Sequence, residues 1–177
     1  MKILYIYRNK SLGFSIAKVF HTIELEMKRY AEVDSFYLPI AGAKPWSLWK
    51  NIQAAYKKAN SQPYDIIHIT GSEHYLIPFL SYRHKIIVTV HDLGFFTNEK
   101  KSLRTFYLYL LWIKTLKYAN IITCVSKKTE KEGKPPVKYV FSATSSTCIF
   151  VPKNETYDDT RRSCRNYYVL QGTQSNL

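Results

Sequence analysis

Short apolar runs alternate with amphipathic segments as far as residue 125, and this alternation constrains the fold more than any other feature. Five apolar runs are predicted strands: residues 3–7, 33–38, 64–70, 85–90 and 121–125. The segments between them predict helices, at about 16–30, 46–59, 74–81 and 102–118. Because continuous apolar strands separated by helices are typical of parallel sheets covered on both faces, we predict an α/β fold with a Rossmann-like parallel sheet and helices on both faces.

The composition changes after Gly133. Residues 134–177 are rich in Ser and Thr, contain Pro135 and Pro136, and show no helical face. We therefore predict one domain over residues 1–133, followed by a linker and an incomplete start of a second domain over residues 134–177. A small β-rich extension of the first domain, with a strand at about 148–151, is the alternative.

The charge and the cysteines indicate the compartment and the kind of partner. Lys and Arg number 26 against 13 Asp and Glu, a net charge of +13, which indicates an anionic partner such as a nucleic acid, an acidic membrane or a phosphorylated ligand. The basic residues are spread and no nucleic-acid motif is present, so we expect no nucleic acid. Three cysteines without metal spacing fit a reducing compartment, and the apolar run at 106–113 is too short to span a bilayer. We predict a cytoplasmic protein, with peripheral contact at the inner face of the membrane as an addition.

Polar and small residues gather where the predicted strands end. In an open parallel sheet, ligands bind beyond the carboxyl ends of the strands, so these positions are candidate site residues. They are Arg8, Gly13, Gly71, Ser72, His74, His91, Asp92 and Ser126. Structural alternatives stay open for several: the glycines could serve tight turns, and Ser126 could cap a helix. His68 lies within a strand and is predicted to be a core histidine.

Motifs that would indicate other chemistry are absent from the sequence. No GxGxxG follows the first strand, and there is no GxxxxGK[ST], HExxH or GxSxG. These absences argue against a dinucleotide-dependent dehydrogenase, a P-loop enzyme, a zinc protease and an α/β-hydrolase. We expect no resident cofactor and no metal site.

The predicted helix at 102–118 is apolar on all sides over residues 106–113 and is flanked by lysines and an arginine. One interpretation is a helix buried between the sheet and a neighbour. The other is a helix that rests an aromatic side on an anionic bilayer, with its lysines reaching the headgroups.

Three strand ends together resemble glycosyltransferase family 4. Residues 64–71 (YDIIHITG) resemble the family's "YDIIH" strand, and residues 87–92 (IVTVHD) resemble its "VxTxHD" strand end. Residues 119–126 (ANIITCVS) resemble its "AD.ii.vS" strand, and residues 126–130 resemble the helix start that follows. The resemblance covers about residues 1–132.

The resemblance implies the N-terminal half of a GT-B fold, in which two Rossmann-like domains face a cleft. In such enzymes this half usually holds the acceptor, and the other half holds the nucleotide-sugar donor through basic residues and a Glu-x7-Glu motif. Here Val151-Pro152 resembles the start of the interdomain hinge, and residues 169–173 resemble the first strand and glycine turn of the donor domain. We therefore expect a truncated or frame-disrupted product that transfers no sugar at a useful rate alone.

The resemblance also implies roles for the candidate residues. His91 would contact the donor sugar, and Asp92 would orient His91 or bind acceptor hydroxyls. Arg8, with the Gly13 turn, would face the acceptor or the leaving phosphate. The remaining candidates, Gly71, Ser72, His74 and Ser126, would bind substrate.

The implied reaction transfers a sugar from a nucleotide sugar to a glycan or lipid-linked acceptor, with retention, as a step of glycan biosynthesis. A non-catalytic module that binds an acceptor or a membrane surface is the alternative function.

Overall fold

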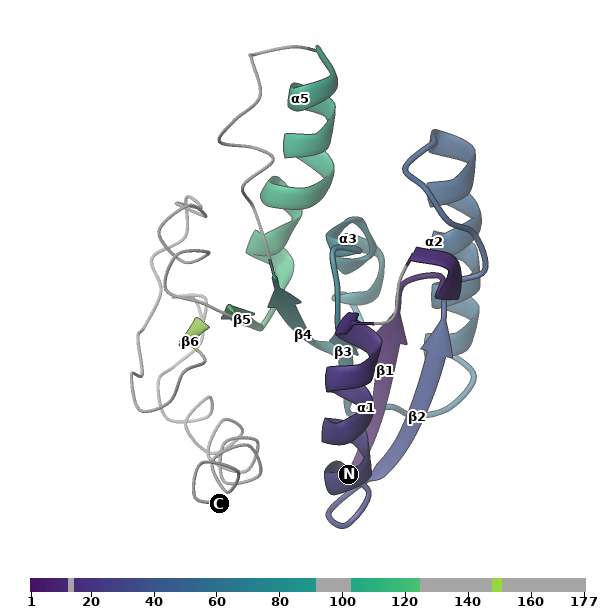
Figure 1. Cartoon of the computed structure of the whole chain (residues 1–177), viewed down its shortest axis with the longest axis vertical. Helices are drawn as coiled ribbons and strands as arrows, with labels where there is room; N and C mark the ends of the chain where they lie inside the picture. The colour runs from purple at the N-terminus through teal and green to yellow at the C-terminus, as the bar shows by residue number, and fades with distance from the viewer. Residues whose placement is uncertain (13–14, 92–102, 125–147, 151–177) are drawn as a thin grey trace.

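The computed structural model describes residues 1–12, 15–91, 103–124 and 148–150, and within them it forms one six-stranded sheet (Figure 1). The strands are β1 (Lys2–Tyr7), β2 (Glu32–Tyr37), β3 (Ile66–Ile69), β4 (Lys85–Val90), β5 (Ile121–Cys124) and β6 (Cys148–Phe150). Their order across the sheet is β2-β1-β3-β4-β5-β6, and the first five pair in parallel. The predicted parallel α/β sheet is confirmed.

β6 pairs with β5 in the antiparallel direction, with Cys124 opposite Cys148. It lies in the segment predicted as a linker and the start of a second domain. The alternative, a β-rich extension of the first domain, places a strand at about the same residues. The division at residue 133 stays a prediction, because one short strand fits either description.

Helices cover both faces of the sheet. They are η1 (Lys10–Leu12), α1 (Ser15–Met27), α2 (Pro45–Ala59), η2 (His74–Leu76), α3 (Ile77–Leu80), α5 (Leu103–Leu108), η3 (Tyr109–Ile113) and η4 (Lys114–Tyr118). α1 packs on one face of the sheet (Figure 1). The other face is covered by α2, η2, α3, η3 and η4.

The alternation of side chains along β1 explains the two layers. Ile3 and Tyr5 pack with Phe20 of α1, whereas Leu4 and Ile6 join the core on the opposite side. Successive residues of a strand point to opposite faces, so a strand buried on both sides must be apolar at every position. This is why the central strands have nearly continuous apolar sequences.

Asn51 joins α2 to two other segments on the second face. Its side chain is buried, and its Nδ2 donates to the Ile40 carbonyl at 2.9 Å and to the Tyr75 hydroxyl at 3.2 Å. Its Oδ1 accepts from the Ile40 N–H at 3.1 Å. One buried amide thereby fixes both the loop after β2 and the η2 turn, which carries a candidate site residue.

The predicted helix at 102–118 is confirmed over residues 103–118, but it is not α-helical throughout. The structure divides it into α5, a π-helical turn (η3) and a 3₁₀ turn (η4). The carbonyl oxygen of Leu111 accepts from the Thr115 hydroxyl at 2.8 Å, and that of Trp112 contacts the His74 ring at 2.9 Å. Side-chain partners for these carbonyl groups stabilise a departure from the regular α-helical pattern.

This segment is buried at one end and exposed at the other. Trp112, Ile113 and Leu116 are buried, whereas Leu103 is 91% exposed and Phe106 is 61% exposed. α5 extends beyond the carboxyl ends of the strands (Figure 1). The interpretation as a buried helix fits the half that contains Trp112, whereas the resting of an aromatic side on a bilayer stays a prediction.

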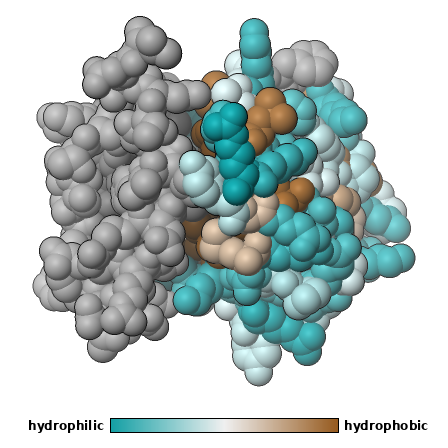
Figure 2. Space-filling view, turned by 90° about the horizontal axis from the view of Figure 1, so that it is seen from below, coloured by the Kyte–Doolittle hydropathy of each residue, from teal (hydrophilic) through white to brown (hydrophobic). Residues whose placement is uncertain are grey.

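The opposite end of the sheet has an ordinary solvent-facing surface. Seen from below, the described part presents mostly hydrophilic side chains, with apolar ones only in limited patches (Figure 2). Among the helices that the structure describes, none combines the length and the apolar character that crossing a membrane requires.

Candidate functional site

The strand order places a topological switch point between β1 and β3. The chain passes from β1 to β2 on one side and then returns to β3 on the other side of β1. In a sheet of order 2-1-3-4-5, the helices that follow β1 and β3 lie on opposite faces, and ligands bind at this switch point beyond the strand carboxyl ends. Arg8 follows β1 there, and Gly71 comes two residues after β3.

Gly71 makes room for the side chain of Glu73. A Cβ atom placed on Gly71 would lie 2.7 Å from Oε2 of Glu73, closer than real Cβ contacts allow. The Glu73 carboxyl therefore folds back over the end of β3, where the residue is only 7% exposed. Burial raises the pKa of Glu73 from 4.5 to about 7, although the Arg8 charge and the backbone N–H of Glu73 itself act in the other direction.

His74 is held in one tautomer by a backbone carbonyl. Its Nδ1 lies 2.9 Å from the carbonyl oxygen of Trp112 and must donate to it, which leaves a lone pair on Nε2. The residue is 2% exposed, and burial lowers its pKa to about 4, so the ring is neutral at pH 7. His74 therefore offers a hydrogen-bond acceptor at the switch point.

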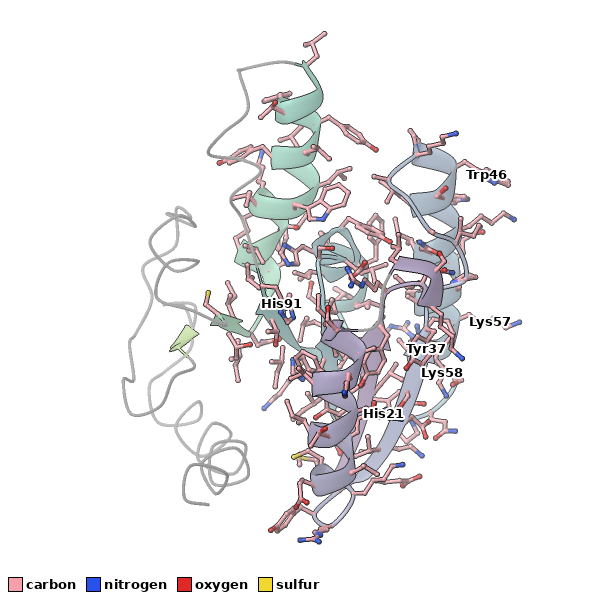
Figure 3. The ribbon with its side chains drawn as sticks, in the orientation of Figure 1. His21, Tyr37, Trp46, Lys57, Lys58 and His91 are labelled. Carbon is pink, nitrogen blue, oxygen red and sulfur yellow. The ribbon has the colours of Figure 1, made fainter. Side chains whose placement is uncertain are left out.

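His91 directly follows β4 and is also held by a carbonyl group. Its Nε2 donates to the Thr70 carbonyl oxygen at 2.8 Å, and its ring contacts Phe20 edge-on with centroids 6.0 Å apart. Figure 3 shows His91 at the end of β4, beside α1. Burial lowers the pKa of His91 and the Arg8 charge lowers it further, against the effect of the Thr70 carbonyl.

Arg8 connects these groups electrostatically. Its charge opposes the rise in the pKa of Glu73 and adds to the lowering of the pKa of His91, so Arg8 lies close enough to act on both groups. His91 in turn lowers the pKa of His74. We call Arg8, Glu73, His74 and His91 the switch-point cluster.

Three buried atoms of the switch-point cluster have no hydrogen-bond partner among the residues that the structure describes. They are Nε of Arg8, Oε2 of Glu73 and Nε2 of His74. A buried polar atom without a partner costs about 1–3 kcal/mol, so native proteins contain few of them. Three at one strand edge fit a place where water or a ligand supplies the partners.

Comparison with known protein families shows which family this chain belongs to. The sequence pattern of Glycosyltransferase Family 4 matches residues 17–135. The chain belongs to glycosyltransferase family 4. The match extends from α1 past β5 and contains Glu73, His74 and His91. No curated protein matches the chain. Family membership indicates a glycosyltransferase function with a sugar donor and an acceptor as substrates.

The sequence predicted most of the residues that this family 4 domain brings together. Arg8, Gly71, His74 and His91 lie at the switch point, whereas Ser72 lies between buried neighbours with its side chain exposed. Three further candidates, Gly13, Asp92 and Ser126, lie outside the described residues. Their assignment to binding or catalysis stays a prediction, as does that of the placed residues.

Glu73 is one of the polar residues that the sequence places after the third strand, but no binding or catalytic role was predicted for it. The signal that could have identified it is an acidic residue two positions after a glycine at the switch point. The Glu73 carboxyl can fold back over the end of β3 because Gly71, two residues before it, has no side chain in its way.

His68 supports the family 4 site from within the sheet, and its prediction as a core histidine is confirmed. It is 1% exposed, its Nε2 lies 2.9 Å from the Thr89 hydroxyl, and Thr89 in turn contacts the Thr123 hydroxyl at 2.7 Å. Its ring packs against Tyr5 and Phe20. Burial, together with a smaller contribution from nearby His91, lowers the pKa of His68 to about 3. Within the described ranges, no three His, Cys, Asp or Glu side chains are grouped so as to hold a metal ion.

Proposed function

We propose that the chain is the acceptor-side domain of an enzyme that transfers a sugar from a nucleotide-sugar donor to an acceptor hydroxyl. The observation that supports this proposal is the set of three buried, unpartnered polar atoms at the switch point among the described residues. Hydroxyl groups of an acceptor would supply the missing partners. The family supplies the reaction class, and the cluster supplies a place for the acceptor.

Each residue of the switch-point cluster would have its own role in the reaction. His91 has its ring fixed by Thr70 and Phe20, so it would present one orientation to the donor sugar. Arg8 would face the diphosphate as it leaves with its negative charge, where a preorganised positive group is most effective. Gly71, Ser72 and His74 would line the acceptor side, and Asp92 would assist His91.

Two assays with the purified chain test the proposal. Ligand-observed NMR measures binding of a panel of methyl glycosides and nucleotide sugars, and a radiolabelled assay measures transfer to glycan and lipid acceptors. We expect His91→Ala to weaken binding or transfer, whereas His21→Ala leaves both unchanged because that side chain is 65% exposed on α1. Binding and transfer that are equal in the His91 variant and the native chain would contradict the role of His91.

A second proposal is a non-catalytic or peripheral role at an anionic membrane, and the outer side of α2 supports it. Trp46, Trp49 and Tyr56 are 65%, 52% and 45% exposed, and they lie on one side of the helix together with Lys50 and Lys57. Figure 3 shows Trp46 and Lys57 pointing away from the sheet. Aromatic rings beside lysines are typical of protein surfaces that rest at a bilayer interface, here the inner face of the membrane.

Vesicle binding tests this second proposal. The chain has three tryptophans, and Trp112 is buried, so a blue shift of fluorescence on binding would report Trp46 and Trp49. We expect a blue shift with vesicles of phosphatidylcholine and phosphatidylglycerol and none with phosphatidylcholine alone. Trp46→Ser with Trp49→Ser should remove vesicle binding measured by co-sedimentation, whereas the exposed Tyr30→Ser should not. Vesicle binding by a chain that binds no methyl glycoside and no nucleotide sugar would favour the non-catalytic function.

A further inference from the structure

The three unpartnered atoms of the switch-point cluster differ in the hydrogen bonds that they can make. Nε of Arg8 can only donate, because a guanidinium group has no acceptor. Nε2 of His74 can only accept, because its ring proton is on Nδ1, facing Trp112. Oε2 of Glu73 accepts when the carboxyl is ionised, and either donates or accepts when it is protonated.

This combination discriminates between classes of ligand group. A phosphate oxygen only accepts, so it would satisfy Arg8 but would confront the lone pair of His74 and the carboxyl of Glu73. An ammonium group only donates, so it would satisfy Glu73 and His74 but would bring a second positive charge to Arg8. A hydroxyl group both donates and accepts, so hydroxyl groups can satisfy the donor of Arg8 and the acceptors of Glu73 and His74 alike.

Burial makes this discrimination strong. Glu73 and His74 are 7% and 2% exposed, so bulk water cannot compensate for a mismatched ligand group. A site built to hydrogen-bond a hydroxyl rejects ligands that leave its buried polar atoms unpaired by large factors. The remaining guanidinium nitrogens of Arg8 stay available for a donor phosphate outside this contact.

We infer that the switch-point cluster binds an uncharged acceptor sugar through adjacent hydroxyl groups, with Glu73 and His74 as specificity-determining residues that disfavour a phosphorylated or amino sugar at this position. The inference deepens the proposed function and rests on it, since it names the chemical class of the acceptor. Gly71 belongs to the same binding site, because any side chain there would displace the Glu73 carboxyl.

The test compares three kinds of probe with the full chain. The methyl α-glycosides of glucose, galactose and mannose present neighbouring hydroxyls in different orientations, and glucose 6-phosphate and glucosamine carry the disfavoured charges. Binding is measured by ligand-observed NMR, and the ¹⁵N chemical shift of His74 Nε2 reports the site directly. We expect at least one neutral glycoside to shift the Nε2 signal and to bind about tenfold or more tighter than either charged probe.

Two variants and a control separate recognition from folding. Glu73→Gln keeps the size of the side chain and should weaken the neutral glycoside about tenfold, and Gly71→Ala should weaken it by displacing the carboxyl. Glu26→Gln, at a partly exposed carboxyl on α1, should leave binding unchanged. Far-UV circular dichroism shows that each variant is folded.

Each outcome has a distinct meaning. Equal or tighter binding of glucose 6-phosphate, or a neutral glycoside that binds without moving the His74 signal, would overturn the inference while leaving sugar transfer possible. Selective binding of a neutral glycoside that His91→Ala leaves unchanged would contradict the role of His91 in the proposed reaction and leave the recognition intact. Absence of binding by every probe would overturn both.

Discussion

Replacing Glu73 with glutamine should make the stability of the fold less dependent on pH in the neutral range. Burial raises the pKa of Glu73 from 4.5 to about 7. Between these values the unfolded chain has released the proton that the folded chain keeps, so the free energy of unfolding falls as the pH rises. At about 1.4 kcal/mol per pH unit, the full loss is about 3 kcal/mol and is complete above pH 7. Glutamine does not ionise and escapes this loss.

Urea unfolding followed by circular dichroism measures the effect. At pH 4 both proteins have a neutral side chain at position 73, so their difference in unfolding free energy serves as the reference. At pH 8.5 we expect that difference to have moved in favour of Glu73→Gln by up to about 3 kcal/mol. Titration of the buried histidines is common to both proteins and cancels in the comparison.

A matched substitution tests whether burial is the cause. Glu26 on α1 has a side chain that is 44% exposed, so Glu26→Gln should show almost no change between the two pH values. An equal change for both variants, or a Glu73 variant whose advantage does not grow with pH, would refute the argument from burial.

Three further substitutions follow from contacts within the fold. Asn51→Ala should lower the free energy of unfolding by about 2–3 kcal/mol, because it leaves buried backbone groups without partners, whereas the exposed Gln53→Ala should change it by less than about 0.5 kcal/mol in the same urea titration. His68→Gln should flatten the loss of stability between about pH 6.5 and 3, since the unfolded chain binds a proton there that the fold excludes; an unchanged acid-unfolding profile would contradict this. Thr115→Val should cost about 1 kcal/mol by removing the bond to the Leu111 carbonyl, and thermal unfolding would detect it.

The central strands were predictable because they are buried on both faces and are therefore nearly continuously apolar, whereas β2 (Glu32–Tyr37) is only partly buried and contains Asp34 and Ser35. The predicted run at 85–90 coincides with β4, and Ile86 to Val90 are all buried there. The switch-point position of Arg8 and His91 was also predictable, since it depends only on strand order and on which end of a strand a residue follows.

The change from α-helical to π- and 3₁₀-helical geometry within residues 103–118 could not be predicted from local sequence. It is accompanied by a bond between Trp112 and His74, residues 38 positions apart in the chain. Helical periodicity describes only neighbours along one helix, so it contains no information about a carbonyl group bonded to another element. The same limit applies to Glu73, whose raised pKa depends on the fold around it.

The charge of the whole chain and the chemistry of the cluster act at different ranges. A net charge of +13 attracts nucleotide diphosphates towards the protein and raises their local concentration, whatever the shape of the site. At the strand edge the local charge does not favour an anion in the same way. His74 is neutral at pH 7, and pH 7 is close to the pKa of Glu73. Arg8 then faces two groups that favour a hydrogen-bond donor over an anion. In the proposed reaction, the long-range field would therefore attract an anionic donor, and the cluster would select an uncharged acceptor.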